Sequence, residues 1–238
     1  MPNYYHCSAK VNHMDSEIDI IFLGINDAGM RVYEWLCDRE AVFIHSLLTT
    51  EDQLRVIEDV HPDYVVSCGY RHIVPEEILD IPTKGCLNLH PAYLPYNRGA
   101  QPNVWSIVDD TPAGVTLHYM DPGIDTGDVV ARRKVDTDFS DTGKGLYEQL
   151  EDAQVELFKN VWPDIVSGDI SVTEQDSDAG TYHRTSEFDE LCRLDPDEEV
   201  RVEEFLDRLR ALTFPPYDNA EIEIDGDTYY VKVDITRE

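Results

Sequence analysis

The sequence predicts a doubly wound α/β fold, in which a mostly parallel sheet lies between two layers of helices. Short apolar segments alternate with helical segments along residues 18–167, and this alternation is typical of such folds. The segment at 18–24 is almost continuously apolar, as expected for a strand that is buried on both faces. With 238 residues and a hydrophobic share of 42%, the chain can form one such domain and a short appendage.

Each element of this Rossmann-like arrangement follows from a local pattern. The predicted strands are residues 18–24, 41–48, 64–68, 85–90, 115–120 and 129–135. The predicted helices are a segment that follows N-cap residues 26–29 and runs to about 39, then residues 51–59, 75–79, 102–108 and 146–167. The helix at 75–79 begins with Pro75 and two acidic residues, which suit the first turn of a helix.

The C-terminal third departs from the alternating pattern. Residues 176–200 are polar and predict a connector that leads into a helix at 200–212. Residues 220–233 alternate in polarity and contain Asp225-Gly226, which predicts a β-hairpin. An isolated hairpin is marginally stable, so we expect it to pack on the main domain or on a second subunit.

These patterns divide the chain into three parts. We expect a lead-in at 1–17, a catalytic α/β domain at 18–175, and a C-terminal helix with a hairpin at 176–238. The lead-in has no clear periodicity, and both a flexible segment and a small cap remain open for it.

The chain is strongly acidic, with a formal net charge of −30 from 49 acidic and 19 basic residues. The acidic residues are spread over the sequence, and residues 132–134 form the densest basic cluster. Such a surface repels nucleic acid, so we expect no nucleic-acid partner. Because salt screens self-repulsion, the composition also suggests the hypothesis of a halophilic source.

Other features exclude several classes of protein. No apolar segment approaches the length of a membrane span, and the polar N-terminus does not have the features of a signal peptide. We therefore expect a cytoplasmic protein without a membrane partner. The five cysteines form no Cys-x-x-Cys pair, and we predict no metal site.

Three polar residues are the strongest candidates for catalysis. Asn88 and His90 lie two residues apart on a predicted strand, so their side chains share one face near its carboxyl end. Asp125 lies in a glycine-rich loop between two later strands. An amide can donate to an oxyanion, an imidazole can accept a proton, and a carboxylate can orient that imidazole. A single histidine is more often a core residue, but the combination favours a catalytic site.

The motifs around these residues resemble those of a known family. Residues 88–95 read Asn-x-His-Pro-x-x-Leu-Pro, and residues 121–128 read Asp-x-Gly-x-Asp-Thr-Gly-Asp. Together they resemble the N10-formyltetrahydrofolate-dependent formyltransferases, and the resemblance is strongest from about 64 to 133. Residues 94–107 look most like the nucleotide-sugar N-formyltransferases.

The resemblance implies an activity and its reactants. It implies transfer of a formyl group from N10-formyltetrahydrofolate to the amine of a nucleotide-linked amino sugar, with a dTDP-amino-hexose as the expected acceptor. Asn88 would donate to the oxyanion, His90 would accept the amine proton, and Asp125 would hold His90. A homodimer that uses the C-terminal region is also implied.

Further residues follow from the same resemblance and from their loops. The expected cofactor-binding residues are Tyr70, Arg71, Ile73, Val74, Asp121 and Gly123. The expected substrate-binding residues are Asn97, Arg98, Gly99, Gln101, Phe214 and Tyr217. For Arg71, a plain strand-to-helix connection is an equally good interpretation, and Phe214 and Tyr217 could equally pack the hairpin.

Three alternatives remain at this point. Methionyl-tRNA formyltransferase shares the motifs but normally carries a larger basic C-terminal domain, whereas residues 170–238 are acidic here. Glycinamide ribonucleotide formyltransferase has a similar core, and the C-terminal hairpin argues against it. A folate- or nucleotide-binding module without turnover is the non-enzymatic alternative, and the three catalytic candidates argue against it.

Overall fold

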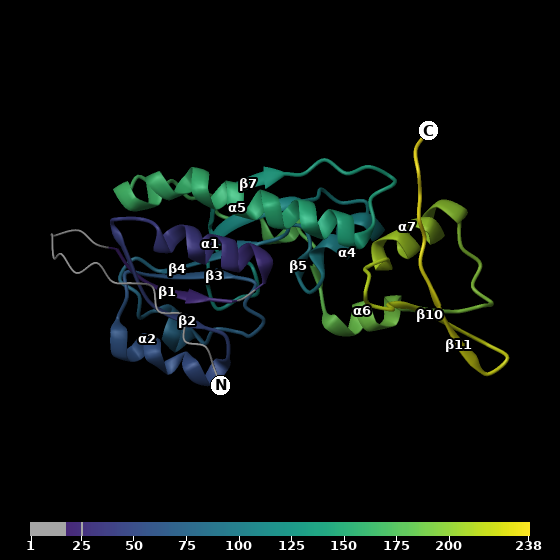
Figure 1. The fold of residues 1–238 in the computed structure, drawn as a ribbon, viewed down its shortest axis with the longest axis horizontal. Helices are drawn as coiled ribbons and strands as arrows, with labels where there is room; N and C mark the ends of the chain where they lie inside the picture. Colours follow the sequence, from purple (N-terminus) through teal and green to yellow (C-terminus); the bar gives the residue numbers. More distant parts are fainter. Residues whose placement is uncertain (1–17, 25) are drawn as a thin grey trace.

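The structure is a computed structural model that describes residues 18–24 and 26–238, so the predicted lead-in at 1–17 lies outside the described residues. Within these residues a six-stranded sheet has the order β2-β1-β3-β4-β6-β7 (Figure 1). Its strands are β1 (Ile18–Leu23), β2 (Val42–Leu48), β3 (Tyr64–Cys68), β4 (Cys86–His90), β6 (Gly114–Tyr119) and β7 (Val129–Lys134).

The direction of the strands changes twice across the sheet, because β6 runs opposite to both of its neighbours. β2, β1, β3 and β4 pair in parallel, whereas β6 pairs antiparallel with both β4 and β7. The predicted mostly parallel α/β sheet is therefore confirmed. In the antiparallel pair, Thr116 lies opposite His90 and Tyr119 lies opposite Leu87, so the loop between β6 and β7 starts beside the beginning of β4. Asp125 of this loop reaches back to His90.

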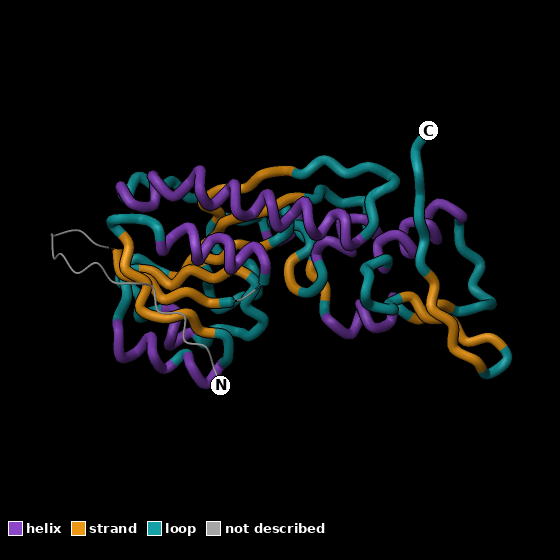
Figure 2. Tube along the Cα trace, viewed as in Figure 1, coloured by secondary structure: helices purple, strands orange, loops and turns teal. Residues whose placement is uncertain are grey.

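Helices cover both faces of this sheet (Figure 2). The helices of the domain are α1 (Asp27–Cys37), α2 (Arg55–Val60), α3 (Glu76–Leu79), α4 (Pro102–Val108) and α5 (Gly143–Ser167). Apolar side chains of α1, α4 and α5 pack with the sheet in one buried cluster, and those of α2 and α3 form a second cluster. The predicted helix at 51–59 is split into a short 3-10 helix, η1 (Glu51–Gln53), and α2.

Helix α5 is the longest helix, and it begins three residues before the predicted start. Thr142 caps it, because its side-chain oxygen accepts a hydrogen bond from the amide of Gly145 at 3.2 Å. Within the helix, the side chain of Gln154 donates to the carbonyl of Leu89 at 2.8 Å. This buried bond fixes α5 against β4, the strand that carries the catalytic candidates.

The prediction of a plain connector at 176–200 was wrong. This segment contains η2 (Ser177–Ala179), β8 (Tyr182–His183), α6 (Thr185–Leu191) and β9 (Arg193–Leu194). The two short strands find partners far away in the sequence: β8 pairs with β5 (Arg98–Gly99), and β9 pairs with β10 (Ala220–Ile224). Such short polar segments have no periodicity that would predict a strand. They form strands here because they pair with β5 and β10.

The predicted C-terminal helix and hairpin are confirmed. Helix α7 (Val202–Leu212) precedes β10 and β11 (Asp227–Val231), which pair antiparallel around Asp225-Gly226. Both turn residues have positive φ angles, 54° and 87°, as this type of two-residue turn requires. Buried residues of α7 and β10 belong to the same apolar cluster as the central sheet, so the appendage packs on the main domain.

The described part of the chain contains neither a helix suited to span a membrane nor a group of side chains suited to bind a metal ion. None of its helices combines the length and the apolar character of a membrane span. In the same residues, no three His, Cys, Asp or Glu side chains are grouped so that they could hold a metal ion.

Candidate active site

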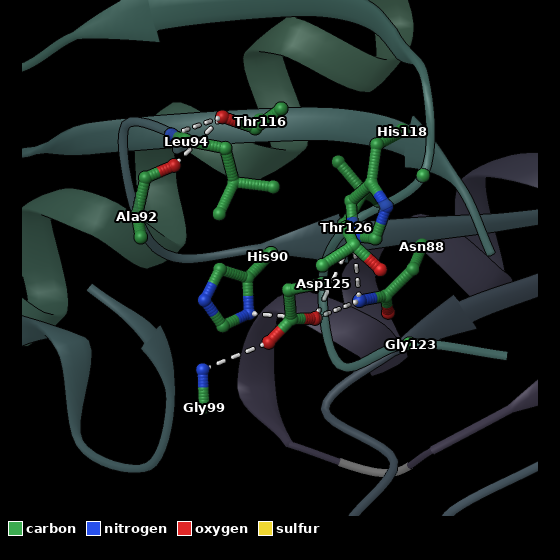
Figure 3. Close-up of polar contacts among 12 residues, drawn as sticks. Asn88, His90, Ala92, Leu94, Gly99, Thr116, His118, Gly123, Asp125 and Thr126 are labelled. Atoms are coloured by element: carbon green, nitrogen blue, oxygen red, sulfur yellow. Dashed lines mark hydrogen bonds and ion pairs between the residues drawn. The ribbon is translucent and has the colours of Figure 1, made fainter. Parts of the chain in front are cut away.

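Strand β4 places the first two candidates on the same side of the sheet, as predicted. The alternate residues Leu87 and Leu89 are buried in the apolar cluster beneath α1 and α5. Asn88 and His90 therefore point to the opposite face, where both reach Asp125. The three residues converge although Asp125 comes from a separate loop (Figure 3).

Asp125 is the centre of this cluster. Its Oδ2 accepts a hydrogen bond from the backbone amide of Gly99 at 3.0 Å. Its Oδ1 lies 3.5 Å from the Nδ2 of Asn88 and 3.6 Å from the Nδ1 of His90. The carboxylate is thus fixed on both oxygens, and its side chain is only 14% exposed.

His90 lies between two acceptors. Its Nδ1 faces the carboxylate of Asp125, and its Nε2 lies 3.3 Å from the carbonyl oxygen of Asn97. A neutral imidazole carries one N–H and can donate to only one of these two acceptors, whereas an imidazolium can donate to both. The surroundings therefore stabilise the form that His90 takes after it has accepted a proton.

Burial and charge act on this pair in opposite directions. Burial lowers the pKa of His90, and the nearby carboxylate of Asp125 offsets this only in part. Burial alone would raise the pKa of Asp125, but His90 and the amide of Gly99 hold that pKa well below its usual range. At neutral pH the pair consists of a neutral imidazole and a carboxylate, so His90 can act as a base.

His118 is a member of the cluster that the sequence analysis missed. It pairs with Asn88 across β4 and β6, and its Nδ1 lies 2.7 Å from the carbonyl oxygen of Tyr119. This contact requires a proton on Nδ1, so Nε2 accepts from the Nδ2 of Asn88 at 3.2 Å. Thr116 and His118 alternate with buried apolar residues along β6, and this two-residue spacing could have indicated a second functional strand.

Thr116 fixes the loop that follows His90. Its hydroxyl donates to the carbonyl of Ala92 at 2.7 Å and accepts from the amide of Leu94 at 3.1 Å (Figure 3). The guanidinium of Arg132 also donates to the carbonyl of Leu94 at 2.6 Å. The loop is held from both sides and leads directly to the segment that contacts Asp125 and His90.

The predicted substrate loop takes part in the cluster mainly through its backbone. The amide of Gly99 and the carbonyl of Asn97 contact Asp125 and His90, as described above. The side chain of Asn97 is buried and bound to Thr111 and Thr181, so it holds the loop together. At Gly99 a side chain would collide with the carbonyl of His183, because an added Cβ would lie 2.4 Å from that oxygen.

The remaining substrate candidates are Arg98, Gln101, Phe214 and Tyr217. Arg98 is partly buried, with its Nε 3.5 Å from the carbonyl of Thr181, and Gln101 is exposed just before α4. Phe214 packs against Tyr147 and Tyr217, with ring centroids 5.5 and 5.9 Å away. No hydrogen bond, ion pair or ring contact of the described residues joins Phe214 or Tyr217 to the cluster. A role in binding remains a prediction for all four.

The predicted cofactor residues fall on two loops. Ile73 is 71% exposed and lines a cleft of about 470 Å³ with Leu54, Pro75 and other residues between α2 and α3, whereas Val74 is buried in the core. Tyr70 is partly buried with its ring 5.2 Å from that of His72, and Arg71 is exposed.

The second loop leads to Asp125. The side chain of Asp121 accepts hydrogen bonds from the amide of Gly123 and the hydroxyl of Thr126. A cleft of about 550 Å³ is lined by Asp121, Thr126 and Gly127, together with Tyr119, Met120, Asp128, Glu174 and Gln175. The side chains of Asn88, His90 and Asp125 line neither cleft. Binding of a cofactor by these residues remains a prediction.

Comparison with known families agrees with this fold. Residues 35–162 match the family model described as formyl transferase, and residues 187–237 match the N-formyltransferase dimerization C-terminal domain. The chain belongs to the formyltransferase family, and it is an enzyme of that class.

Two curated relatives extend the match over most of the chain. A GDP-perosamine N-formyltransferase of Brucella melitensis is 30% identical over 97% of this chain and 89% of the relative. A dTDP-4-amino-4,6-dideoxyglucose formyltransferase of Mycobacterium bovis is 33% identical over 72% of each chain.

Solved structures share the fold. A 4-N formyltransferase from Francisella tularensis superposes with a TM-score of 0.83 and 24% identity, over 93% of this chain and 99% of its own. The formyltransferase PseJ from Anoxybacillus kamchatkensis has a TM-score of 0.66 and 31% identity, over 80% of this chain and 98% of its own. PseJ was solved in complex with UDP-4,6-dideoxy-4-formamido-L-AltNAc and tetrahydrofolate.

Proposed function

We propose that this enzyme transfers a formyl group from N10-formyltetrahydrofolate to the amine of a nucleotide-linked amino sugar. The observation that carries the proposal is the convergence of Asn88, His90 and Asp125, with Asp125 held by the amide of Gly99. The relatives named above are formyltransferases of GDP- and dTDP-linked amino sugars. The amino sugar supplies the nucleophile, and the folate supplies the carbon that is attacked.

The side chains of the cluster suit the two charges that formyl transfer develops. The Nδ2 of Asn88 donates to the formyl oxygen as negative charge grows on it. This requires only the long 3.5 Å contact with Asp125 to be redirected, because His118 keeps the other hydrogen of the amide. His90 takes the proton of the attacking amine, and Asp125 and the carbonyl of Asn97 stabilise the imidazolium. The bond between the formyl carbon and N10 of the folate then breaks, N10 takes up a proton, and tetrahydrofolate leaves.

The acceptor we propose is a dTDP-amino-hexose, with a GDP-linked sugar as the competing possibility. Arg98 and Gln101, which lie where the loop enters α4, are the proposed contacts to the anionic part of the acceptor. Tyr70, Ile73, Asp121 and Gly123 are the proposed folate contacts. The acidic surface argues against tRNA as the acceptor, because a charge of −30 repels phosphates.

The organisation of the protein completes the proposal. We propose that residues 18–175 form the catalytic domain, and that residues 176–238 join two chains in a homodimer. The exposed apolar residues of the hairpin and the match to a dimerization domain support the second part. The cytoplasm of a cell with high internal salt is the proposed setting, on the basis of the acidic composition.

A mass-spectrometric screen tests the proposed reaction. The protein would be incubated with N10-formyltetrahydrofolate and a panel of dTDP-, GDP- and UDP-amino sugars, at low and high KCl. We expect one of these acceptors to gain the mass of a formyl group. Initiator methionyl-tRNA and glycinamide ribonucleotide serve as competing acceptors in the same assay.

Two outcomes would contradict the proposal. Formyl transfer to tRNA or to the ribonucleotide alone would replace the sugar acceptor. Tight folate binding without transfer to any acceptor would favour a binding module over a transferase.

A further inference from the structure

A short segment after α5 crosses beside the loop that carries Asp125. Thr173 and Val129 exchange two backbone hydrogen bonds, of 2.8 and 2.9 Å, which attach this segment to the start of β7. Two residues later, Gln175 lies against the loop at 121–128. The segment belongs to the polar part of the sequence and has no part in the chemistry described above.

The side-chain amide of Gln175 holds two carbonyl groups of this loop. Its Nε2 donates to the carbonyl of Asp125 at 3.0 Å and to the carbonyl of Gly127 at 2.6 Å. Asp125 itself has a φ angle of 53°, a left-handed conformation that is unfavourable for residues with a side chain. The two hydrogen bonds therefore stabilise the strained backbone from which the carboxylate projects.

The space around the loop shows why such a support is needed. The cleft of about 550 Å³ lies against the loop and is lined by Asp121, Thr126 and Gly127. Gln175 lines the same cleft, so it reaches the loop from a side that is otherwise open. Without its two hydrogen bonds, the loop could relax into this space and carry Asp125 away from His90.

We propose that Gln175 is a positioning residue, which holds the Asp125 loop in the geometry needed for formyl transfer. The proposal rests on the proposed function for its effect on turnover, but its effect on the loop stands by itself. The donor groups of Gln175 are the ones that matter, because its Oε1 is buried without a hydrogen-bond partner among the described residues.

Two substitutions separate the role of the donors from that of the side-chain size. Gln175→Met keeps the length of the side chain and removes both donors. Gln175→Glu keeps the shape but turns a carboxylate toward two carbonyl oxygens, and this carboxylate becomes a single donor when it is protonated. Gln149→Glu is the matched control, because Gln149 lies on the exposed surface of α5 and donates to the side chain of Asp141.

The first measurement is hydrogen–deuterium exchange of the protein without substrates. We expect the amides of residues 121–128 to exchange at least about tenfold faster in Gln175→Met than in wild type, because the local support is lost. Exchange in β1 and α1 should stay unchanged, which would show that the fold is intact. This measurement does not depend on which acceptor the enzyme uses.

The second measurement is turnover as a function of pH. In both variants we expect kcat to fall about 10- to 100-fold, with KM for both substrates within about twofold of wild type, because the catalytic groups are misplaced. For Gln175→Glu, the kcat of the variant divided by the kcat of wild type at the same pH should rise as pH falls from about 8 to about 5.5, because protonation of the new carboxylate restores a donor. In Gln175→Met this ratio should not change with pH.

The outcomes distinguish this proposal from the proposed function. Unchanged loop exchange in Gln175→Met, or wild-type kcat in both variants, would overturn the role of Gln175. A pH-independent ratio in Gln175→Glu, equal to that in Gln175→Met, would also overturn it. Failure of wild type to transfer formyl groups would reject the proposed function, while the exchange measurement would still decide whether Gln175 holds the loop.

Discussion

Single residues in this site depend on the partners that surround them. His118 uses one ring nitrogen to bind a backbone carbonyl, and this leaves the other nitrogen as an acceptor for the amide of Asn88. The amide is thereby turned so that its second hydrogen points toward Asp125. His90 has an acceptor on each side, so proton transfer to it completes a set of hydrogen bonds that the neutral ring leaves incomplete.

Replacement of Asn88 should affect the chemical step. We expect Asn88→Ala to lower kcat about 100- to 1000-fold, which is the usual cost of losing one oxyanion donor, with the fold intact. Steady-state kinetics with circular dichroism would measure this. Asn160→Ala, an exposed position on α5, is the matched control. Turnover of Asn88→Ala near that of wild type would remove Asn88 from the mechanism.

The pH dependence should report the ionisation of His90. Because burial lowers its pKa below the ordinary value of 6.5, the imidazole is neutral and active at neutral pH. We therefore expect kcat/KM to stay constant near neutral pH and to fall on the acid side, with an apparent pKa below 6.5. His90→Asn should lose more activity than Asn88→Ala and show a flat profile. An unchanged acid limb in His90→Asn would mean that another group is the base.

Whole elements position these residues through contacts between distant parts of the chain. Strand β8 pairs with β5, which places the amide of Gly99 against Asp125. In the hairpin, Ala220 and Ile222 face the core, and Ile224 and Tyr229 lie on the same face beyond it. Ile224 is 41% exposed and Tyr229 is 52% exposed. The hairpin therefore presents an apolar surface that the rest of the chain does not cover.

The hairpin should form the contact between two chains. We expect wild type to sediment as two chains of 27.2 kDa each, and Tyr229→Asp to weaken this dimer at least about tenfold, because a charge would be buried at the interface. Analytical ultracentrifugation measures both. Thr228→Asp, on the opposite face of β11, is the control and should remain dimeric. A wild-type monomer would contradict this prediction.

At the scale of the whole molecule, charge is the dominant feature. A net charge of −30 on a surface of 14027 Å² places many carboxylates at short distances from one another. Their repulsion opposes folding at low ionic strength, whereas salt reduces its range from about 10 Å at 0.1 M to about 3 Å at 1 M. The same charge opposes the approach of nucleic-acid phosphates.

The stability of the protein should therefore increase with salt. We expect Tm to rise by at least about 5 °C between 0.1 and 2 M KCl, because the folded chain gains from screening. Differential scanning calorimetry measures this, and an uncharged osmolyte of equal osmolality is the control. A Tm that stays flat or falls as KCl increases would reject the hypothesis of a halophilic source.

The sequence by itself determined the order of strands and helices, the hairpin at Asp225-Gly226, and the two motifs that contain Asn88, His90 and Asp125. These features depend on local periodicity and on residue types at fixed spacing. Both kinds of pattern are visible in the amino-acid sequence itself. Tertiary structure alone decided the regular elements within 176–200 and the participation of His118 and Gln175. Their roles arise from partners that are close in space and distant in sequence, because hydrogen bonds form between atoms in contact and no local pattern specifies those contacts.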